Sequence, residues 1–139
     1  MDKADKAANY KELKALALEL GFDLFGVADV TGMRGEFLLE PETCDRFGLA
    51  ISLGKRLSDA VLDDIRDHPT QIYFHHYRQT NFFLDRGALL VADHIQKRGF
   101  RSMAIAAIGG AAPAASSGIR RACSIGAPGP PLPLPPKYP

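Results

Sequence analysis

The stretch "QIYFHHYRQTNFFLDRGALLVADHIQK", Gln71 to Lys97, decides the fold, because its apolar residues recur at helical spacing along its whole length. Three apolar rows run along it: the first is Tyr73, Tyr77, Leu84, Ala88, Val91 and Ile95, the second is Phe82 and Leu89, and the third is Ile72, Phe83 and Leu90. A helix that is apolar on several sides is normally buried between layers or against another subunit. The pattern therefore predicts a long helix that is covered on more than one side.

The polar residues of this helix are the first candidates for a site. Asn81 falls inside the first apolar row, where an unbonded amide would cost on the order of 1–3 kcal/mol. It therefore either ties the helix to a neighbouring backbone or reaches a ligand. His75 and His76 are adjacent, so they point about 100° apart and cannot both bind one metal ion. We expect surface or packed histidines, and the sequence predicts no metal site.

The elements around the long helix follow from periodicity and capping signals. We predict helices over 6–20, from a cap at Ser58 to about Asp67, and over 71–97 capped by Thr70, with strands over 22–30, 47–54 and 102–108. The strand over 47–54 is apolar enough to be buried on both faces. The order α-β-β-α-α-β predicts an α+β domain, arranged as a layered α/β sandwich.

The bulk composition narrows the functional classes. A chain of 139 residues with a net charge of +1 is long enough for one domain, and its charge does not indicate a nucleic-acid or membrane partner. No apolar run approaches the roughly 20 residues of a membrane span, and the N-terminus lacks a secretory signal. Cys44 and Cys123 are far apart, which indicates neither a disulfide framework nor a zinc site, so a cytoplasmic protein is expected. No nucleophile–base pair is visible, and no catalytic residue can be assigned.

The chain changes character near Gly109. Residues 109–139 hold every proline except Pro41 and Pro69 and contain no Asp or Glu. The ending "GAPGPPLPLPPKYP" cannot form a helix or a central strand, because proline lacks a backbone donor and fixes φ. We therefore expect a domain over 1–108 and a Pro/Gly/Ala-rich tail over 109–139. Three interpretations of the tail compete: a disordered appendage, a proline-rich ligand for an aromatic groove, and the product of a shifted reading frame.

Three segments carry a further signal. They are "LKALALELGFDLFGVADV" (13–30), "FGLAISLGKRLSDAVLDDI" (47–65) and "YFHHYRQTNFFLDRGALLVADHIQKRGFRSMAI" (73–105). Together they resemble the N-terminal region of the epoxyqueuosine reductase-like iron–sulfur proteins, which are similar to cobalamin-dependent reductive dehalogenases. The resemblance covers nearly all of residues 10–106. It depends mainly on His76-Tyr77, Asn81, Leu84-Asp85, Ile95 and Gly99.

The resemblance implies a cytosolic oxidoreductase built on a nitroreductase-like core, a mixed sheet with flanking helices. It also implies cobalamin as a cofactor, [4Fe–4S] clusters in a C-terminal ferredoxin-like domain, and tRNA as a partner through the family's tRNA modification. On the same basis, Tyr77, Asn81 and Asp85 would line a cofactor pocket in this chain.

The chain departs from the family pattern where the tail begins. No CxxCxxCxxxCP motif is present, and [4Fe–4S] clusters require cysteine thiolates, so this chain is not expected to bind a cluster. The first hypothesis is a truncated N-terminal portion of such an oxidoreductase, without electron-transfer activity. The alternative is a small homo-oligomeric binding or interaction module with a proline-rich tail. A third possibility is a protein that takes cobalamin without clusters. Self-association is expected, because a core that lacks its later strands leaves apolar surface uncovered.

Overall fold

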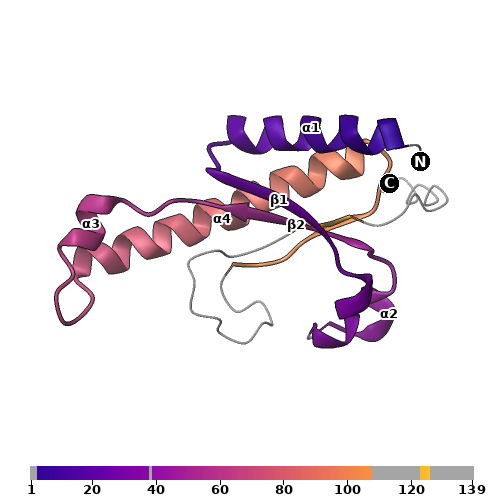
Figure 1. The fold of residues 1–139 in the computed structure, drawn as a ribbon. Helices are drawn as coiled ribbons and strands as arrows, with labels where there is room; N and C mark the ends of the chain where they lie inside the picture. Colours follow the sequence, from indigo (N-terminus) through magenta and orange to yellow (C-terminus); the bar gives the residue numbers. More distant parts are fainter. Residues whose placement is uncertain (1–2, 38, 108–122, 126–139) are drawn as a thin grey trace, which may run out of the picture.

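The computed structural model describes residues 3–37, 39–107 and 123–125 (Figure 1). In chain order the elements are α1 (Lys3–Glu19), β1 (Leu24–Asp29), the 3-10 helix η1 (Thr31–Glu36), α2 (Pro41–Cys44), β2 (Leu49–Gly54), α3 (Asp59–Asp63), α4 (Gln71–Lys97), β3 (Ser102–Ala104) and β4 (Cys123–Ile125). Helices and an antiparallel sheet occur together, which confirms the α+β class. In the described part of the chain, no helix is both long and apolar enough to cross a membrane.

The sheet has the strand order β1-β2-β4-β3, and every neighbouring pair is antiparallel. The expectation of a mixed sheet is therefore wrong. Strands β2 and β3 do run in the same direction, but β4 lies between them and runs opposite to both. The sequence did not predict β4, which comes from the expected tail. The rest of 109–139, including the proline-rich ending, lies outside the described residues.

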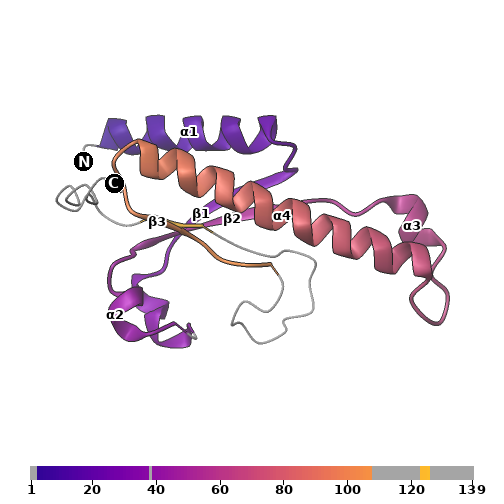
Figure 2. The same ribbon diagram turned by 180° about the vertical axis from the view of Figure 1, so that it is seen from behind.

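The core lies between the sheet and two helices. Figure 2 shows α1 and α4 side by side, and both contribute to one buried cluster with β2. Ile51 and Leu53 lie two residues apart on β2, so both side chains point into this cluster, and they are 0% and 1% exposed. Val91 of α4 belongs to the same cluster and is 0% exposed. Burying such side chains contributes roughly 1.5–3 kcal/mol each relative to leaving them in water.

Strand β2 is covered completely on one face only. Ala50 and Ser52, which point away from the helices, are half-buried, so the expected burial on both faces is wrong. The predicted strands and the helix after Ser58 are all shorter than expected, with β1 at Leu24–Asp29 and β2 at Leu49–Gly54. The helix after Ser58 ends at Asp63, and the strand from Ser102 ends at Ala104.

Helix α4 has the predicted bounds, Gln71–Lys97. The predicted cap also forms, because the Thr70 hydroxyl oxygen accepts a hydrogen bond of 3.0 Å from the backbone N–H of Tyr73. The first apolar row is largely buried, whereas Phe82 and Leu89 of the second row are 54% and 62% exposed. The described residues therefore leave the second row uncovered, whereas Phe83 of the third row packs against the core cluster.

Thr70 and Ser58 provide a matched test of capping. Replacing Thr70 by Ala should lower the free energy of unfolding by about 0.5–2 kcal/mol, because the Tyr73 N–H at the start of α4 loses its acceptor. Ser58 precedes α3 but its side chain makes no capping bond, so Ser58→Ala should have a much smaller effect. Urea unfolding of both variants measures the difference. Equal losses would mean that the Thr70 cap contributes nothing specific.

Helix α1 is fixed to the end of α4 by a polar cluster at the surface. Glu12 Oε1 lies 2.9 Å from His94 Nε2 and 2.5 Å from Arg98 Nη1. These contacts, first the hydrogen bond from His94, lower the pKa of Glu12 below its ordinary value of 4.5. Asp23 is bonded by the backbone N–H of Arg56 and by Lys55, and these contacts lower its pKa below 3.8.

Both shifts predict a loss of stability in acid. A carboxyl group whose pKa is lower in the folded state stabilises the fold above its unfolded pKa, and this contribution disappears as the pH falls through the folded pKa. Thermal stability should therefore decrease as the pH drops below about 4.5, which is the pKa of Glu12 in the unfolded chain. Melting temperatures measured from about pH 6 down to about pH 3 should fall less steeply in Glu12→Gln than in the parent chain. Equal slopes would show that the cluster does not contribute.

Candidate functional site

The three residues that the resemblance assigns to a cofactor lie in one row on α4. Tyr77, Asn81 and Asp85 follow one another at i, i+4 and i+8, so their side chains descend the same side of the helix over two turns. The structure therefore places them one turn after another along the same helix. What they contact decides whether they form a site.

Asn81 bonds to its own helix. Its side chain is 3% exposed, and Nδ2 donates a hydrogen bond of 2.8 Å to the carbonyl oxygen of Tyr77. No buried side-chain nitrogen or oxygen in the described ranges lacks a hydrogen-bond partner. The observed partner is neither the neighbouring backbone nor the ligand that the sequence left open, because the carbonyl belongs to the previous turn of the same helix.

Asp85 holds a distant part of the chain. Its Oδ1 accepts a hydrogen bond of 2.5 Å from the backbone N–H of Ala107, a residue that is 7% exposed. Ala107 follows strand β3, so the bond anchors the outgoing chain against α4. A buried N–H without an acceptor is costly, and a charged acceptor makes the stronger kind of hydrogen bond. Asp85 is thus a structural anchor.

Tyr77 offers an aromatic ring. It is half-buried and stacks on Tyr73 with the ring centroids 6.2 Å apart. Cobalamin would need polar groups that are free to orient it, but Asn81 Nδ2 and Asp85 Oδ1 already bond the protein's own backbone. As placed, the row does not fit a cobalamin pocket.

A cluster site is also not supported by the thiols of this chain. Cys44 is buried, and its thiol lies 3.8 Å from the carbonyl oxygen of Leu39. The full sequence contains only one other cysteine, Cys123, whereas a [4Fe–4S] cluster is held by four thiolates. The residues of this chain therefore do not fit a cluster.

Two histidines of α4, His76 and His94, bond other parts of the chain. His76 Nε2 accepts a hydrogen bond of 3.0 Å from the backbone N–H of Ser58, which fixes the start of α3 against α4. His94 bonds Glu12 of α1. Among the residues that the structure places, no group of three His, Cys, Asp or Glu side chains is arranged to hold a metal ion.

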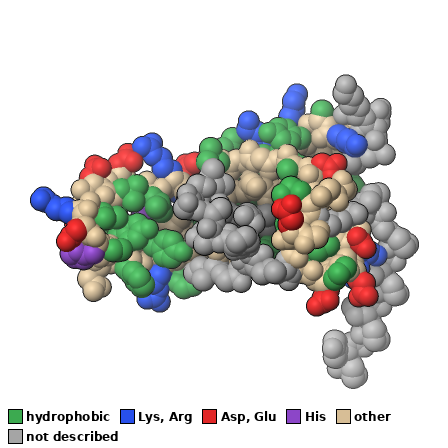
Figure 3. Space-filling view, turned by 60° about the horizontal axis from the view of Figure 1, so that its bottom comes forward, with side chains coloured by type: hydrophobic (Ala, Val, Ile, Leu, Met, Phe, Trp, Pro, Cys, Tyr) green, Lys and Arg blue, Asp and Glu red, His purple; other side chains and the backbone are tan. Residues whose placement is uncertain are grey.

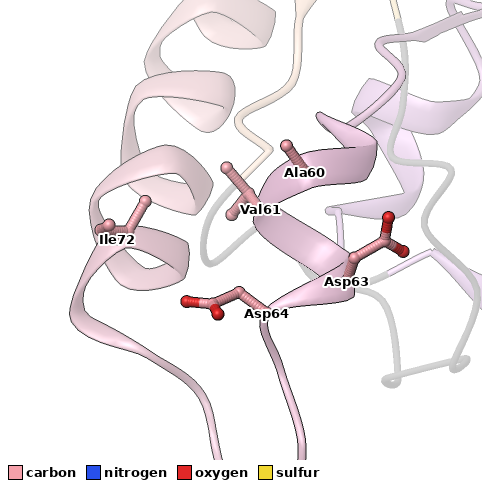
Figure 4. A pocket seen from close by; sticks show the side chains of 5 residues that line it. All are labelled: Ala60, Val61, Asp63, Asp64 and Ile72. Carbon is pink, nitrogen blue, oxygen red and sulfur yellow. The ribbon is translucent and has the colours of Figure 1, made fainter.

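A shallow hollow of about 400 Å³ lies between α3 and the start of α4 (Figure 4). It is lined by Ala60, Val61, Asp63, Asp64 and Ile72. In Figure 4 the Asp64 carboxylate turns toward α4, whereas that of Asp63 turns away from it. The two carboxylates are exposed and do not converge, so they form a solvated helix face rather than a site for acid–base or metal chemistry.

Comparison of the chain with protein-family models, curated proteins and solved structures finds no match. The resemblance to the epoxyqueuosine reductase-like proteins is therefore still a prediction.

Sequence reasoning missed the two contacts that organise this region, Ser58 to His76 and Ala107 to Asp85. Each joins residues that are far apart along the chain, so no local spacing indicates the pair. The one available signal was the presence of His76 and Asp85 on a helix with several apolar rows, where buried polar groups require partners.

Proposed function

We propose that this chain is the N-terminal portion of an epoxyqueuosine reductase-like oxidoreductase, with a partial nitroreductase-like core, and that it transfers no electrons itself. The sequence pattern over 10–106 and the α+β class support the first part. The number of cysteines supports the absence of electron transfer, because the chain provides two cysteines and a [4Fe–4S] cluster requires four thiolates. On this proposal the protein is cytoplasmic, and any action on tRNA belongs to the complete reductase.

Anaerobic reconstitution with iron and sulfide tests the proposal. After desalting, the protein should retain no iron and show no visible thiolate-to-iron absorbance. A Cys44→Ser, Cys123→Ser variant is the matched control, and its spectrum should be the same as that of the parent chain. A stable cluster spectrum that disappears in the control would show that this chain does hold iron and would overturn the proposal.

Cobalamin binding stays a prediction of the resemblance, and the contacts of Asn81 and Asp85 argue against it. Titration of hydroxocobalamin with the protein should leave the visible spectrum of the cobalamin unchanged. A saturable spectral shift that is lost in Tyr77→Ala would restore the row on α4 as a cofactor site.

A second function of a different class is a small binding or interaction module. Figure 3 shows hydrophobic side chains gathered at the α3 end of the molecule. There Leu62, Ile72 and Phe74 are 39%, 63% and 59% exposed, in addition to Phe82 and Leu89 farther along α4. Adjacent exposed apolar residues of this kind mark interaction surfaces.

Deletion of residues 126–139 separates the module from its proline-rich ending and leaves β4 in the chain. If α4 carries the interaction, the oligomeric state measured by light scattering should survive the deletion, provided that the shortened chain keeps its helical circular dichroism. Loss of association in a folded deletion variant would instead assign the interaction to the tail.

A further inference from the structure

We infer that the outer face of α4 pairs with the same face of a second copy of this chain, with the two helices antiparallel. The outer face is defined by Arg78, Phe82, Leu89 and Asp93. The inference rests on the interaction module proposed above and names its partner.

The outer face is apolar at its centre and free of other described elements. Phe82 and Leu89 are seven residues apart, so they lie on one side of α4 two turns from each other, and both are more than half exposed. Figure 2 shows α4 running along the front of the molecule in that view, with the sheet behind it. The buried residues of α4, among them Ala88 and Val91, lie on the opposite side.

Neighbouring contacts bound this face on both sides. On one side Phe83 and His94 of α4 face Gly21 and Glu12, near and within α1. On the other side Asp85 holds Ala107. Between these contacts the surface of α4 is open over its central turns, which leaves room for a second helix at the usual interaxial distance of about 8–10 Å.

The charges on this face specify a second copy as the occupant. Arg78 lies four residues before Phe82, and Asp93 lies four residues after Leu89, all on the same side of the helix. When two copies meet antiparallel with Phe82 against the partner's Leu89, Arg78 comes opposite the partner's Asp93. A two-fold axis repeats each contact, so one register satisfies both apolar pairs and both ion pairs.

The same charges exclude the parallel arrangement. With parallel helices in register, Arg78 would face Arg78 of the partner subunit, and like charges across an interface are unfavourable.

Asp93 already lies 2.6 Å from Lys97 of its own helix, and both side chains are mostly exposed. Such an exposed pair is weak, so the carboxylate can accept a second cation from the partner. Because each copy contributes two large apolar side chains, the contact belongs to the class of small, weak interfaces.

Charge exchange at Arg78 and Asp93 tests the pairing. Sedimentation velocity over a wide range of protein concentration should show a reversible monomer–dimer equilibrium for the parent chain. Arg78→Asp and Asp93→Arg should each raise the dissociation constant at least about tenfold, because each places like charges opposite each other. The double variant restores opposite charges in both pairs and should recover the parent equilibrium. Arg66→Asp, which changes an exposed arginine outside this face, is the matched control and should have no effect.

The outcomes distinguish this pairing from the broader proposal. A dimer that is unaffected by either single change, or that the double variant fails to restore, would overturn the pairing while leaving an interaction module that uses another surface. A chain that stays monomeric at every concentration would overturn the pairing and would remove self-association from the module as well. All three positions changed in this test are exposed, and far-UV circular dichroism verifies that each variant is folded.

Discussion

Gly87→Ala should destabilise the protein, although alanine is the better helix former. The exchange normally gains about 0.5–1 kcal/mol within a helix. Here a Cβ on Gly87 would lie 2.5 Å from Cε2 of Phe22 and would overlap the end of its ring. Phe22 is 2% exposed, and its ring packs 5.0 Å from that of Phe83, so it has little room to move. Overpacking costs about 1–3 kcal/mol, so the net loss is up to about 2.5 kcal/mol.

A double-mutant cycle with Phe22→Leu isolates this clash. Leucine lacks the outer ring atoms, so Gly87→Ala should cost less in the Phe22→Leu background than in the parent chain, or should even stabilise it. Gly32→Ala is the control, because a Cβ at Gly32 meets no atom within 4 Å and should have a small effect. Urea unfolding followed by circular dichroism gives each free energy. A Gly87→Ala variant more stable than the parent chain would show that Phe22 does not fill this space.

Asp85→Ala should cost about 1–3 kcal/mol, because it leaves the buried N–H of Ala107 without its acceptor. Asp85→Asn keeps an oxygen that can accept the N–H of Ala107, so this variant should retain most of the free energy of unfolding. It should lose only the part of that free energy that depends on the charge of the carboxylate. The two variants separate the hydrogen bond from the loss of side-chain volume. They also separate anchoring from cofactor binding, because a cofactor ligand would have little effect on the stability of a protein without cofactor.

Hydrogen exchange locates the effect of this change. In Asp85→Ala the amide of Ala107 should exchange faster, while amides at the centre of α4 change only with global stability. If the amide of Ala107 is equally protected in both proteins, another group satisfies it and the anchoring role is wrong.

The sequence predicts those parts of the fold that depend on local spacing. The bounds of α4 follow from the apolar periodicity of the sequence. Its cap follows from Thr70, a residue type that favours this position and whose hydroxyl accepts the N–H of Tyr73 three residues later. Helix α2 was missed, although Pro41 at its first position and Glu42 in its first turn are local signals that indicate a helix start. Strand β4 has no such signal, because its partners in β2 are more than 70 residues away in the chain.

The candidate site was predictable in position but not in role. Helical spacing places Tyr77, Asn81 and Asp85 in one row, and the apolar surroundings of Asn81 show that it requires a partner. The identity of each partner depends on distant geometry. Only the folded chain shows that Ala107 reaches Asp85 and that Asn81 turns back to the carbonyl of Tyr77.

The placement of β4 has a consequence for synthesis on the ribosome. Strands β1 and β2 are joined by the segment that contains η1 and α2, and they can pair once β2 has emerged. The other edge of β2 receives its partner only when residues 123–125 have emerged. Until then the backbone N–H and C=O groups along that edge are unpaired and can template pairing with another nascent chain. Translation that slows between Ala107 and Cys123 would therefore lengthen the interval in which this chain is most prone to aggregate.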